Sequence, residues 1–155
     1  MAQSKKKKLK KIKFLINTLR EDINVKYHRV LPLNEYLGNR WEKASYLQWG
    51  EGSNCYDSAY IFGDVKVGEN TFVGPFCILD GGGGLRIGKF CSISAGVQIY
   101  THHSVRWANS GGRESLQYAP CGYKGDNMEC INSLVCEGGS LTNNHFLARE
   151  VRYAS

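Results

Sequence analysis

The strongest constraint on the fold is an aliphatic residue at every sixth position between residues 61 and 99. The series holds Ile61, Val67, Val73 and Leu79 and continues, after a two-residue slip, with Ile87, Ile93 and Ile99. Small residues form a second series, at Val65, Thr71, Cys77 and Gly83 in steps of six and then at Cys91 and Val97, two before Ile93 and Ile99. Such a repeat suits a short strand followed by a corner, and stacking the repeats buries a continuous aliphatic column. The strands of an ordinary sandwich would instead alternate with period two over longer runs.

The N-terminal segment carries the excess positive charge and predicts an amphipathic helix. Lysines occupy positions 5, 6, 7, 8, 10, 11 and 13, and the remaining 142 residues hold 13 basic and 14 acidic side chains. Over residues 5–23, apolar side chains recur at three-to-four spacing, at Leu9, Ile12, Leu15, Ile16, Leu19 and Ile23. Such a helix either packs on its own protein or makes a weak contact with an anionic membrane surface. The nearly neutral body argues against nucleic-acid binding.

The sequence predicts a cytoplasmic protein, with at most a peripheral position at the inner face of the membrane. No apolar run reaches the ~18 residues of a membrane span. The N-terminal stretch also lacks the apolar centre and cleavage site of a signal peptide. The six cysteines, at positions 55, 77, 91, 121, 130 and 136, are then expected to be reduced and mostly small core residues. No CxxC pair occurs among them, so we expect no metal.

The residue pattern changes after residue 58, from an irregular sequence to the six-residue repeat, and this change divides the chain into two parts. Residues 1–58 are expected to form a helical and irregular segment, in which Tyr36, Trp41 and Trp49 are candidates to cap a core. Residues 59–155 are expected to form the repeat domain, with an external loop at 104–120 and irregular C-terminal repeats. The pattern weakens after that loop because Lys124 stands at an aliphatic position.

The stretch IFGDVKVGENTFVGPFCILDGGGGLRIGKFCSISAGVQIYTHH (residues 61–103) resembles the consecutive repeats of the hexapeptide-repeat acyltransferases. Its residue pattern is similar to that of the small O-acetyltransferases of surface-polysaccharide and lipopolysaccharide biosynthesis, and more distantly to that of the maltose and galactoside acetyltransferases. The likeness covers residues 41–120, about half of the chain. It implies a mainly β fold, a left-handed parallel β-helix, and a homotrimer.

The resemblance also implies an activity and a catalytic base. The activity is transfer of an acetyl group from acetyl-CoA, a co-substrate, to a sugar hydroxyl, with histidine as the general base. His102 and His103 are the candidates, because they follow the last repeat where relatives place their catalytic histidine. His102 is preferred, since relatives begin this loop with Tyr-Thr-His and a ring at His103 would crowd a small inward position.

Residues around the two histidines are candidates for binding the substrates. The acceptor-site candidates are Asp80, Tyr100, Trp107 and Glu114. Asp80 could hold a sugar hydroxyl or serve as a turn residue, and Trp107 could stack on a sugar or anchor the loop. Glu114 could orient the catalytic histidine. By position in the resemblance, Ser133 and Gly139 are candidates for contacts with coenzyme A.

Other functions stay open at this point. The irregular repeats after Pro120 also fit a truncated or degraded relative that folds without catalysing a reaction. Transfer to the amine of an amino-sugar nucleotide is a second alternative. A zinc enzyme of the γ-carbonic anhydrase type would need three separated histidines, which the adjacent His102 and His103 with a distant His145 do not supply. The acceptor and the length of the acyl chain are not identified by the sequence.

Overall fold

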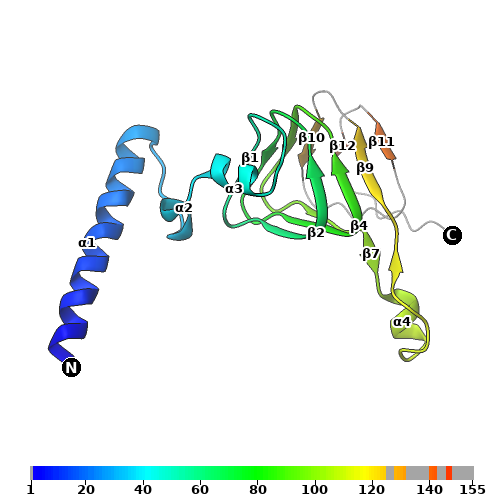
Figure 1. Ribbon diagram of the computed structural model, residues 1–155, viewed down its shortest axis with the longest axis horizontal. Coiled ribbons are helices and arrows are strands. Elements are labelled where there is room, and N and C mark those ends of the chain that lie inside the picture. Colours follow the sequence, from blue (N-terminus) through cyan, green and yellow to red (C-terminus); the bar gives the residue numbers. More distant parts are fainter. Residues whose placement is uncertain (1, 125–127, 132–139, 143–145, 148–155) are drawn as a thin grey trace. The chain divides into compact units, whose positions relative to one another are not determined.

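The computed structural model describes residues 2–124, 128–131, 140–142 and 146–147, with side chains from residue 4 to residue 122. The chain forms two compact units, Met1–Asn39 and Arg40–Ser155 (Figure 1). The functional candidates that the structure describes with their side chains all lie in the second unit.

The first unit consists of α1 (Ala2–Tyr27) and α2 (Asn34–Leu37). α1 confirms the helix expected over residues 5–23 and extends it at both ends, because no glycine or proline precedes Pro32. It ends where His28 adopts a left-handed backbone conformation, with φ of 52°. The chain then turns toward α2, where the buried Tyr36 accepts a hydrogen bond from the Leu31 amide at 2.6 Å. Among the described residues, no helix is both long and apolar enough to span a bilayer.

The second unit begins with α3 (Arg40–Tyr46) and continues as short parallel strands. One sheet has the order β1-β3-β5-β10-β12, formed by Asn54–Cys55, Phe72–Val73, Cys91–Ile93, Met128–Ile131 and Phe146–Leu147. The other has the order β11-β9-β4-β2, formed by Ser140–Thr142, Cys121–Lys124, Ile78–Ile87 and Tyr60–Val67, and β6 (Gln98–Ile99) also pairs with β4. Asn54 pairs with Phe72 and Phe72 with Ser92, so partners lie 18 or 20 residues apart. The spacing of 18 equals three six-residue repeats, and the spacing of 20 equals three repeats plus the two-residue slip.

The predicted fold class, a mainly β chain forming a left-handed parallel β-helix, is wrong. The chain is mixed α/β, with a long N-terminal helix and small parallel sheets, β1-β3-β5 and β2-β4-β6. α1 has 26 residues, whereas the longest described strand, β4, has 10. The physical reason is that a six-residue period identifies side chains that are buried together. It fixes neither the lengths of the strands nor how they divide into sheets.

Residues 102–118 leave these parallel sheets. β7 (His102–His103) pairs antiparallel with β8 (Gln117–Tyr118), and α4 (Val105–Asn109) lies between them. The segment 104–120, expected as an external loop, therefore holds a short helix and a short strand. The β7–β8 pair closes the base of this excursion and fixes the backbone of both histidines.

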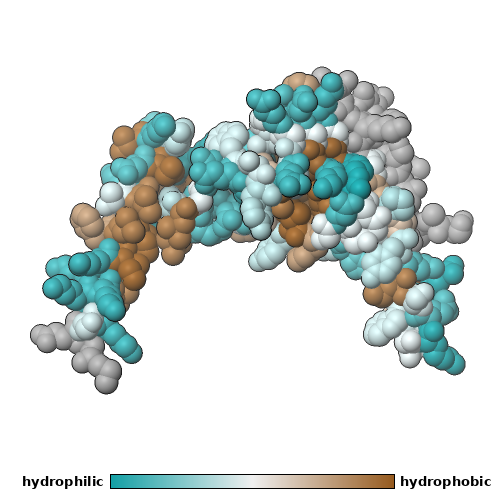
Figure 2. Space-filling model, in the orientation of Figure 1, coloured by the Kyte–Doolittle hydropathy of each residue, from teal (hydrophilic) through white to brown (hydrophobic). Residues whose placement is uncertain are grey.

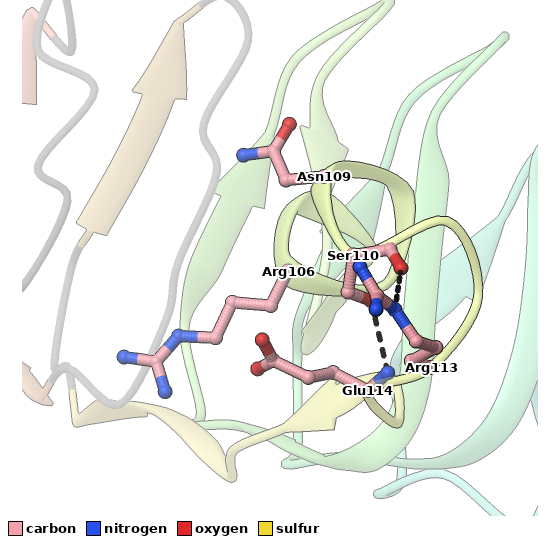
Figure 3. A pocket seen from close by; sticks show the side chains of 5 residues that line it. All are labelled: Arg106, Asn109, Ser110, Arg113 and Glu114. Atoms are coloured by element: carbon pink, nitrogen blue, oxygen red, sulfur yellow. Dashed lines mark hydrogen bonds between the residues drawn. The ribbon is translucent and has the colours of Figure 1, made fainter.

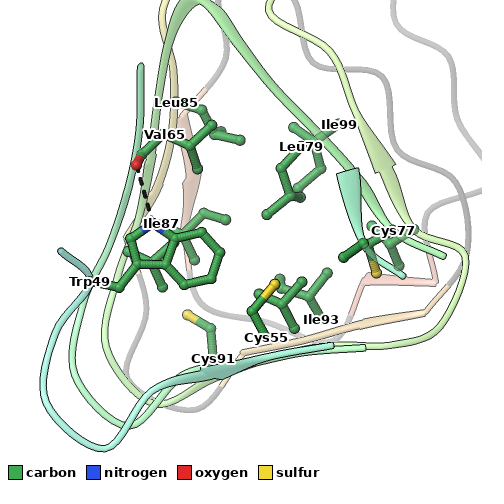
Figure 4. Packing of buried hydrophobic residues seen from close by; sticks show 14 of the residues in the cluster. Trp49, Cys55, Val65, Cys77, Leu79, Leu85, Ile87, Cys91, Ile93 and Ile99 are labelled. Atoms are coloured by element: carbon green, nitrogen blue, oxygen red, sulfur yellow. Dashed lines mark hydrogen bonds between the residues drawn. The ribbon is translucent and has the colours of Figure 1, made fainter. Parts of the chain in front are cut away.

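The aliphatic series fills the core of the second unit, as the sequence predicts. Six of its members are buried, namely Val67, Val73, Leu79, Ile87, Ile93 and Ile99. Ile61 is partly buried against them. Figure 4 shows Leu79, Ile87, Ile93 and Ile99 of this series pointing into the core, with the backbone running around them. Leu85 is also fully buried, and the prediction missed it because it lies in the slip, where the register changes.

Two residues of the preceding segment attach it to this core. Trp49 is buried, and its Nε1 donates a hydrogen bond to the Val65 carbonyl oxygen at 3.3 Å (Figure 4). Lys43, on α3, donates from Nζ to three carbonyl oxygens, at 2.9 Å for Tyr56 and Asp57 and at 2.7 Å for Ala59. The ammonium group thus uses all three of its donors on backbone that follows β1.

The cysteines in the described part of the chain are core residues. Cys55, Cys77, Cys91 and Cys121 are all buried, which confirms that part of the prediction. Cys130 and Cys136 lie outside the residues with described side chains. Burial raises the pKa of the Cys77 thiol, and its Sγ donates to the Ser94 carbonyl oxygen at 3.0 Å. Cys77 is therefore a protonated, inert side chain at neutral pH.

Candidate active site

The site begins at Thr101, a fully buried residue that joins two distant segments of the second unit. Its Oγ1 donates a hydrogen bond to the Asp80 carbonyl oxygen at 2.9 Å and accepts one from the Gly83 amide at 2.7 Å. Its carbonyl oxygen accepts a hydrogen bond from the Ala119 amide at 2.9 Å. Thr101 therefore connects three segments of the chain. They are residues 80–84, the start of β7, and the residues that follow β8.

Asp80 and His102 lie in close contact through their side chains. Oδ2 of Asp80 lies 2.6 Å from Nδ1 of His102. The Asp80 side chain is only 9% exposed, and its Oδ1 accepts a hydrogen bond from the Gly82 amide at 2.7 Å. A carboxylate that is this deeply buried is stabilised by such hydrogen bonds and by a cationic or N–H partner. Each oxygen of Asp80 thus has its own partner.

The orientation of the His102 ring separates its two nitrogens. Nδ1 is buried, whereas the side chain as a whole is 35% exposed. The exposed surface of the side chain therefore belongs to atoms other than Nδ1. The Nδ1 contact is short but is not aligned as a hydrogen bond in this structure. A small rotation of the ring would align it, and catalytic contacts are often misaligned before substrate binds.

Two tyrosine rings flank His102. The ring of Tyr100 stands nearly perpendicular to the imidazole, with centroids 6.3 Å apart, and its hydroxyl donates to Oε1 of Gln98 at 3.0 Å. The ring of Tyr118, the cross-strand partner of His102, lies 5.7 Å away at an angle of 31°. Tyr118 is 56% exposed. Sequence analysis included Tyr100 among its candidates and missed Tyr118.

The glycines after Asp80 allow this close approach. A Cβ at Gly83 would lie 2.6 Å from the Thr101 carbonyl oxygen and 2.7 Å from that of Ala119. A Cβ at Gly82 would lie 3.1 Å from Oδ1 of Asp80 and 3.3 Å from the ring of Tyr118. Side chains at these two positions would push the slip away from β7 and β8. The run of four glycines is thus the sequence signal for the contact between Asp80 and His102.

His103 has a different environment from its neighbour. Its Nδ1 accepts a hydrogen bond from the Val105 amide at 3.2 Å, at the start of α4. This bond assigns the proton of the neutral ring to Nε2, the reverse of the arrangement that the Asp80 contact favours at His102. The two adjacent histidines are therefore chemically distinct, and the one with a buried carboxylate partner is His102.

The remaining acceptor-site candidates lie on the excursion around α4. Arg106, Asn109, Ser110, Arg113 and Glu114 line an open pocket of about 490 Å³ (Figure 3). Two hydrogen bonds to Ser110 stabilise the pocket. Its carbonyl oxygen accepts a hydrogen bond from Nε of Arg113 at 2.8 Å, and its Oγ accepts one from the Glu114 amide at 2.9 Å. Glu114 thus lines this pocket, and the carboxylate beside His102 is that of Asp80. Trp107 is 48% exposed and approaches Gly112, whose φ is 82°.

Some candidates fall outside the described part of the chain. Ser133 and Gly139, expected to contact coenzyme A, and His145 belong to the residues that are not described. Among the residues that the structure does describe, no three histidine, cysteine, aspartate or glutamate side chains are grouped so as to hold a metal ion.

Comparison with known proteins adds no assignment. No protein-family model matches the sequence, and a comparison with curated proteins finds no match either. The site itself consists of a buried aspartate, a partly exposed histidine and two flanking tyrosines.

Proposed function

We propose that the chain is an acyltransferase that moves an acetyl group from acetyl-CoA to a hydroxyl group of a saccharide. The observation that carries the proposal is the 2.6 Å contact between Oδ2 of the buried Asp80 and Nδ1 of the partly exposed His102. A carboxylate at Nδ1 keeps the proton of the neutral ring on that nitrogen. Nε2 is then left with a free lone pair, as a general base requires.

The chemistry follows from that tautomer. Nε2 of His102 takes the proton of the acceptor hydroxyl while its oxygen attacks the carbonyl carbon of the thioester. Asp80 stabilises the imidazolium that forms. The tetrahedral intermediate collapses by breaking the carbon–sulfur bond, and the coenzyme A thiolate receives the proton from Nε2. An ester and a free thiol result, and the enzyme returns to its starting state without a covalent intermediate.

The surroundings of His102 support a saccharide as the acceptor. Tyr118 and Trp107 present partly exposed aromatic surfaces on the same excursion of the chain, and such faces pack against the apolar faces of sugar rings. The resemblance of residues 61–103 to sugar O-acetyltransferases supports the same class, although the β-helix that it implied is wrong. The homotrimer that the resemblance implies and a cytoplasmic location are also part of the proposal.

The test is acceptor-dependent release of coenzyme A from acetyl-CoA by the purified full chain, with hexoses, amino sugars and nucleotide sugars as acceptors. Coenzyme A is quantified by chromatography. We expect His102→Ala to lower kcat/KM on the order of 10²–10⁴-fold. Asp80→Asn lowers kcat as well, because an amide that donates to Nδ1 stabilises the opposite tautomer. Treating the product with mild base distinguishes an O-acetyl ester, which is cleaved, from an N-acetyl amide, which survives.

His103→Ala is the matched control, since it removes the neighbouring imidazole without touching Asp80. It should keep most of the activity. A loss as large as that of His102→Ala, or full activity of His102→Ala, would overturn the assignment of the base. If no acceptor in the panel increases coenzyme A release, the proposed activity itself is wrong and the non-catalytic alternative takes its place.

A further inference from the structure

We propose that α1 binds flat on the surface of an anionic lipid bilayer, with its apolar face toward the acyl chains and its lysines toward the lipid headgroups. The inference concerns the first unit alone and is independent of the acyltransferase chemistry. It rests on which side chains share a face of α1, how exposed they are, and how the charge is distributed along the chain.

The apolar face of α1 is exposed along its first half. Leu9, Ile12 and Leu15 are each slightly more than half exposed. At about 100° per residue, positions 9, 12, 15, 16, 19 and 23 all fall within one third of the helix circumference. Figure 2 shows this apolar surface along the helix, next to the hydrophilic start of α1. A continuous apolar stripe that a soluble protein leaves uncovered marks a contact surface.

The charge on the same half of the helix identifies the partner. The first 20 residues contain seven lysines and one arginine, and the first acidic residue is Glu21. Five of the lysines, at positions 6, 7, 10, 11 and 13, lie outside the apolar third of the circumference. An apolar stripe bordered by lysines matches the layering of an anionic bilayer, in which phosphate groups lie above acyl chains. At about 1.5 Å per residue, the 26 residues of α1 give a contact about 39 Å long.

Two other partners fit these observations less well. A nucleic acid would pair with the lysines, but it offers no apolar layer for Leu9, Ile12 and Leu15. A second copy of the chain could cover the apolar stripe, but it would bring two lysine-rich segments together. Like charges at that distance repel each other, and nothing acidic in the first half of α1 offsets them.

The experiment measures binding of the full chain to vesicles by co-sedimentation. One set of vesicles contains phosphatidylcholine with about a third phosphatidylglycerol, a fraction that we choose for the assay, and the other contains phosphatidylcholine alone. We expect binding to the anionic vesicles, little binding to the neutral ones, and weaker binding as salt is raised. Lys10→Gln with Lys11→Gln should weaken binding roughly 30-fold, since each lysine near such a surface contributes about fivefold.

Matched variants separate this surface from general charge and general hydrophobicity. Lys66→Gln with Lys89→Gln removes the same charge from the second unit and should leave binding unchanged. Ile12→Gln with Leu15→Gln should abolish most binding while keeping helix propensity. Phe14→Gln with Val25→Gln removes apolar side chains that are even more exposed, but from the opposite side of α1, and should have little effect.

The proposal is overturned by any of three results. The first is equal binding to neutral and anionic vesicles. The second is an equal loss of binding for the Ile12/Leu15 and Phe14/Val25 pairs. The third is binding to DNA that is tighter than binding to anionic vesicles and survives Ile12→Gln with Leu15→Gln. Circular dichroism of each variant checks that the helix content is unchanged.

Discussion

The core of the second unit and the helix α1 are both recognisable from periodic aliphatic residues, yet they use those residues in opposite ways. Ile93 and Ile99, members of the six-residue series, are 0% exposed in the core. Ile12 and Leu15, members of the three-to-four series on α1, are 54% and 53% exposed. The spacing of apolar residues thus shows which side chains share a face. It does not show what covers that face.

The difference has a physical origin in the neighbours of each series. A strand inside these sheets is paired with parallel strands that carry the same repeat, so its inward side chains meet equivalent ones. Val73 and Ile93, for example, are register partners in β3 and β5. The first half of α1 has no repeated neighbour of that kind. A covered face contributes to stability, and an uncovered one is available for binding.

The largest expected effect is in the core. Ile93→Ala should lower the free energy of unfolding by about 2–5 kcal/mol, because it removes buried methylene groups and leaves a cavity. Urea titration monitored by the fluorescence of the buried Trp49 measures this change. A loss below about 1 kcal/mol would mean that the series does not pack as a close-fitting core.

An intermediate effect is expected where α3 joins the core. Lys43→Met keeps the length and most of the apolar stem of the side chain but leaves three carbonyl oxygens without their ammonium donor. The free energy of unfolding should fall by about 1–3 kcal/mol in the same titration. The control is Lys66→Met, at a largely exposed lysine, which should be nearly neutral. Equal effects of the two variants would show that the three hydrogen bonds contribute nothing.

The smallest effect is expected on α1, and it sharpens the comparison most. Leu15→Ala removes as many methylene groups as a core substitution would, but from a half-exposed position and with a residue of higher helix propensity. The free energy of unfolding should change by less than about 0.5 kcal/mol. A loss close to that of Ile93→Ala would show that the stripe is covered in solution, and it would contradict the membrane proposal as well.

The sequence predicts the burial of the core well and the assignment of its fold class poorly. Val73, Leu79, Ile93 and Ile99 are fully buried as the spacing requires. The period could not predict Leu85, which enters the core through the irregular slip. It also could not predict that the strands would form small sheets in a mixed α/β chain, because the length and grouping of strands depend on tertiary pairing rather than on spacing.

The candidate site was predicted as a set of residues and not as an arrangement. Asp80 and His102 were both identified, but the sequence assigned Asp80 to the acceptor and Glu114 to the histidine. The contact between Asp80 and His102 depends on Thr101, whose hydroxyl bonds both sides of the slip, and on Gly83, where a side chain would clash. Hydrogen bonds between residues about 20 positions apart carry no periodic signal. Only the structure brings these residues together.

The most direct test of the proposed site is the tautomeric state of its two adjacent histidines. Nitrogen-15 NMR of the side chains, at a pH where both rings are neutral, reports which nitrogen carries the proton. The account predicts that His102 is protonated on Nδ1, facing Asp80, and that His103 is protonated on Nε2, with Nδ1 accepting from Val105. Finding the proton of His102 on Nε2 would remove the free lone pair from that nitrogen and contradict its role as the base.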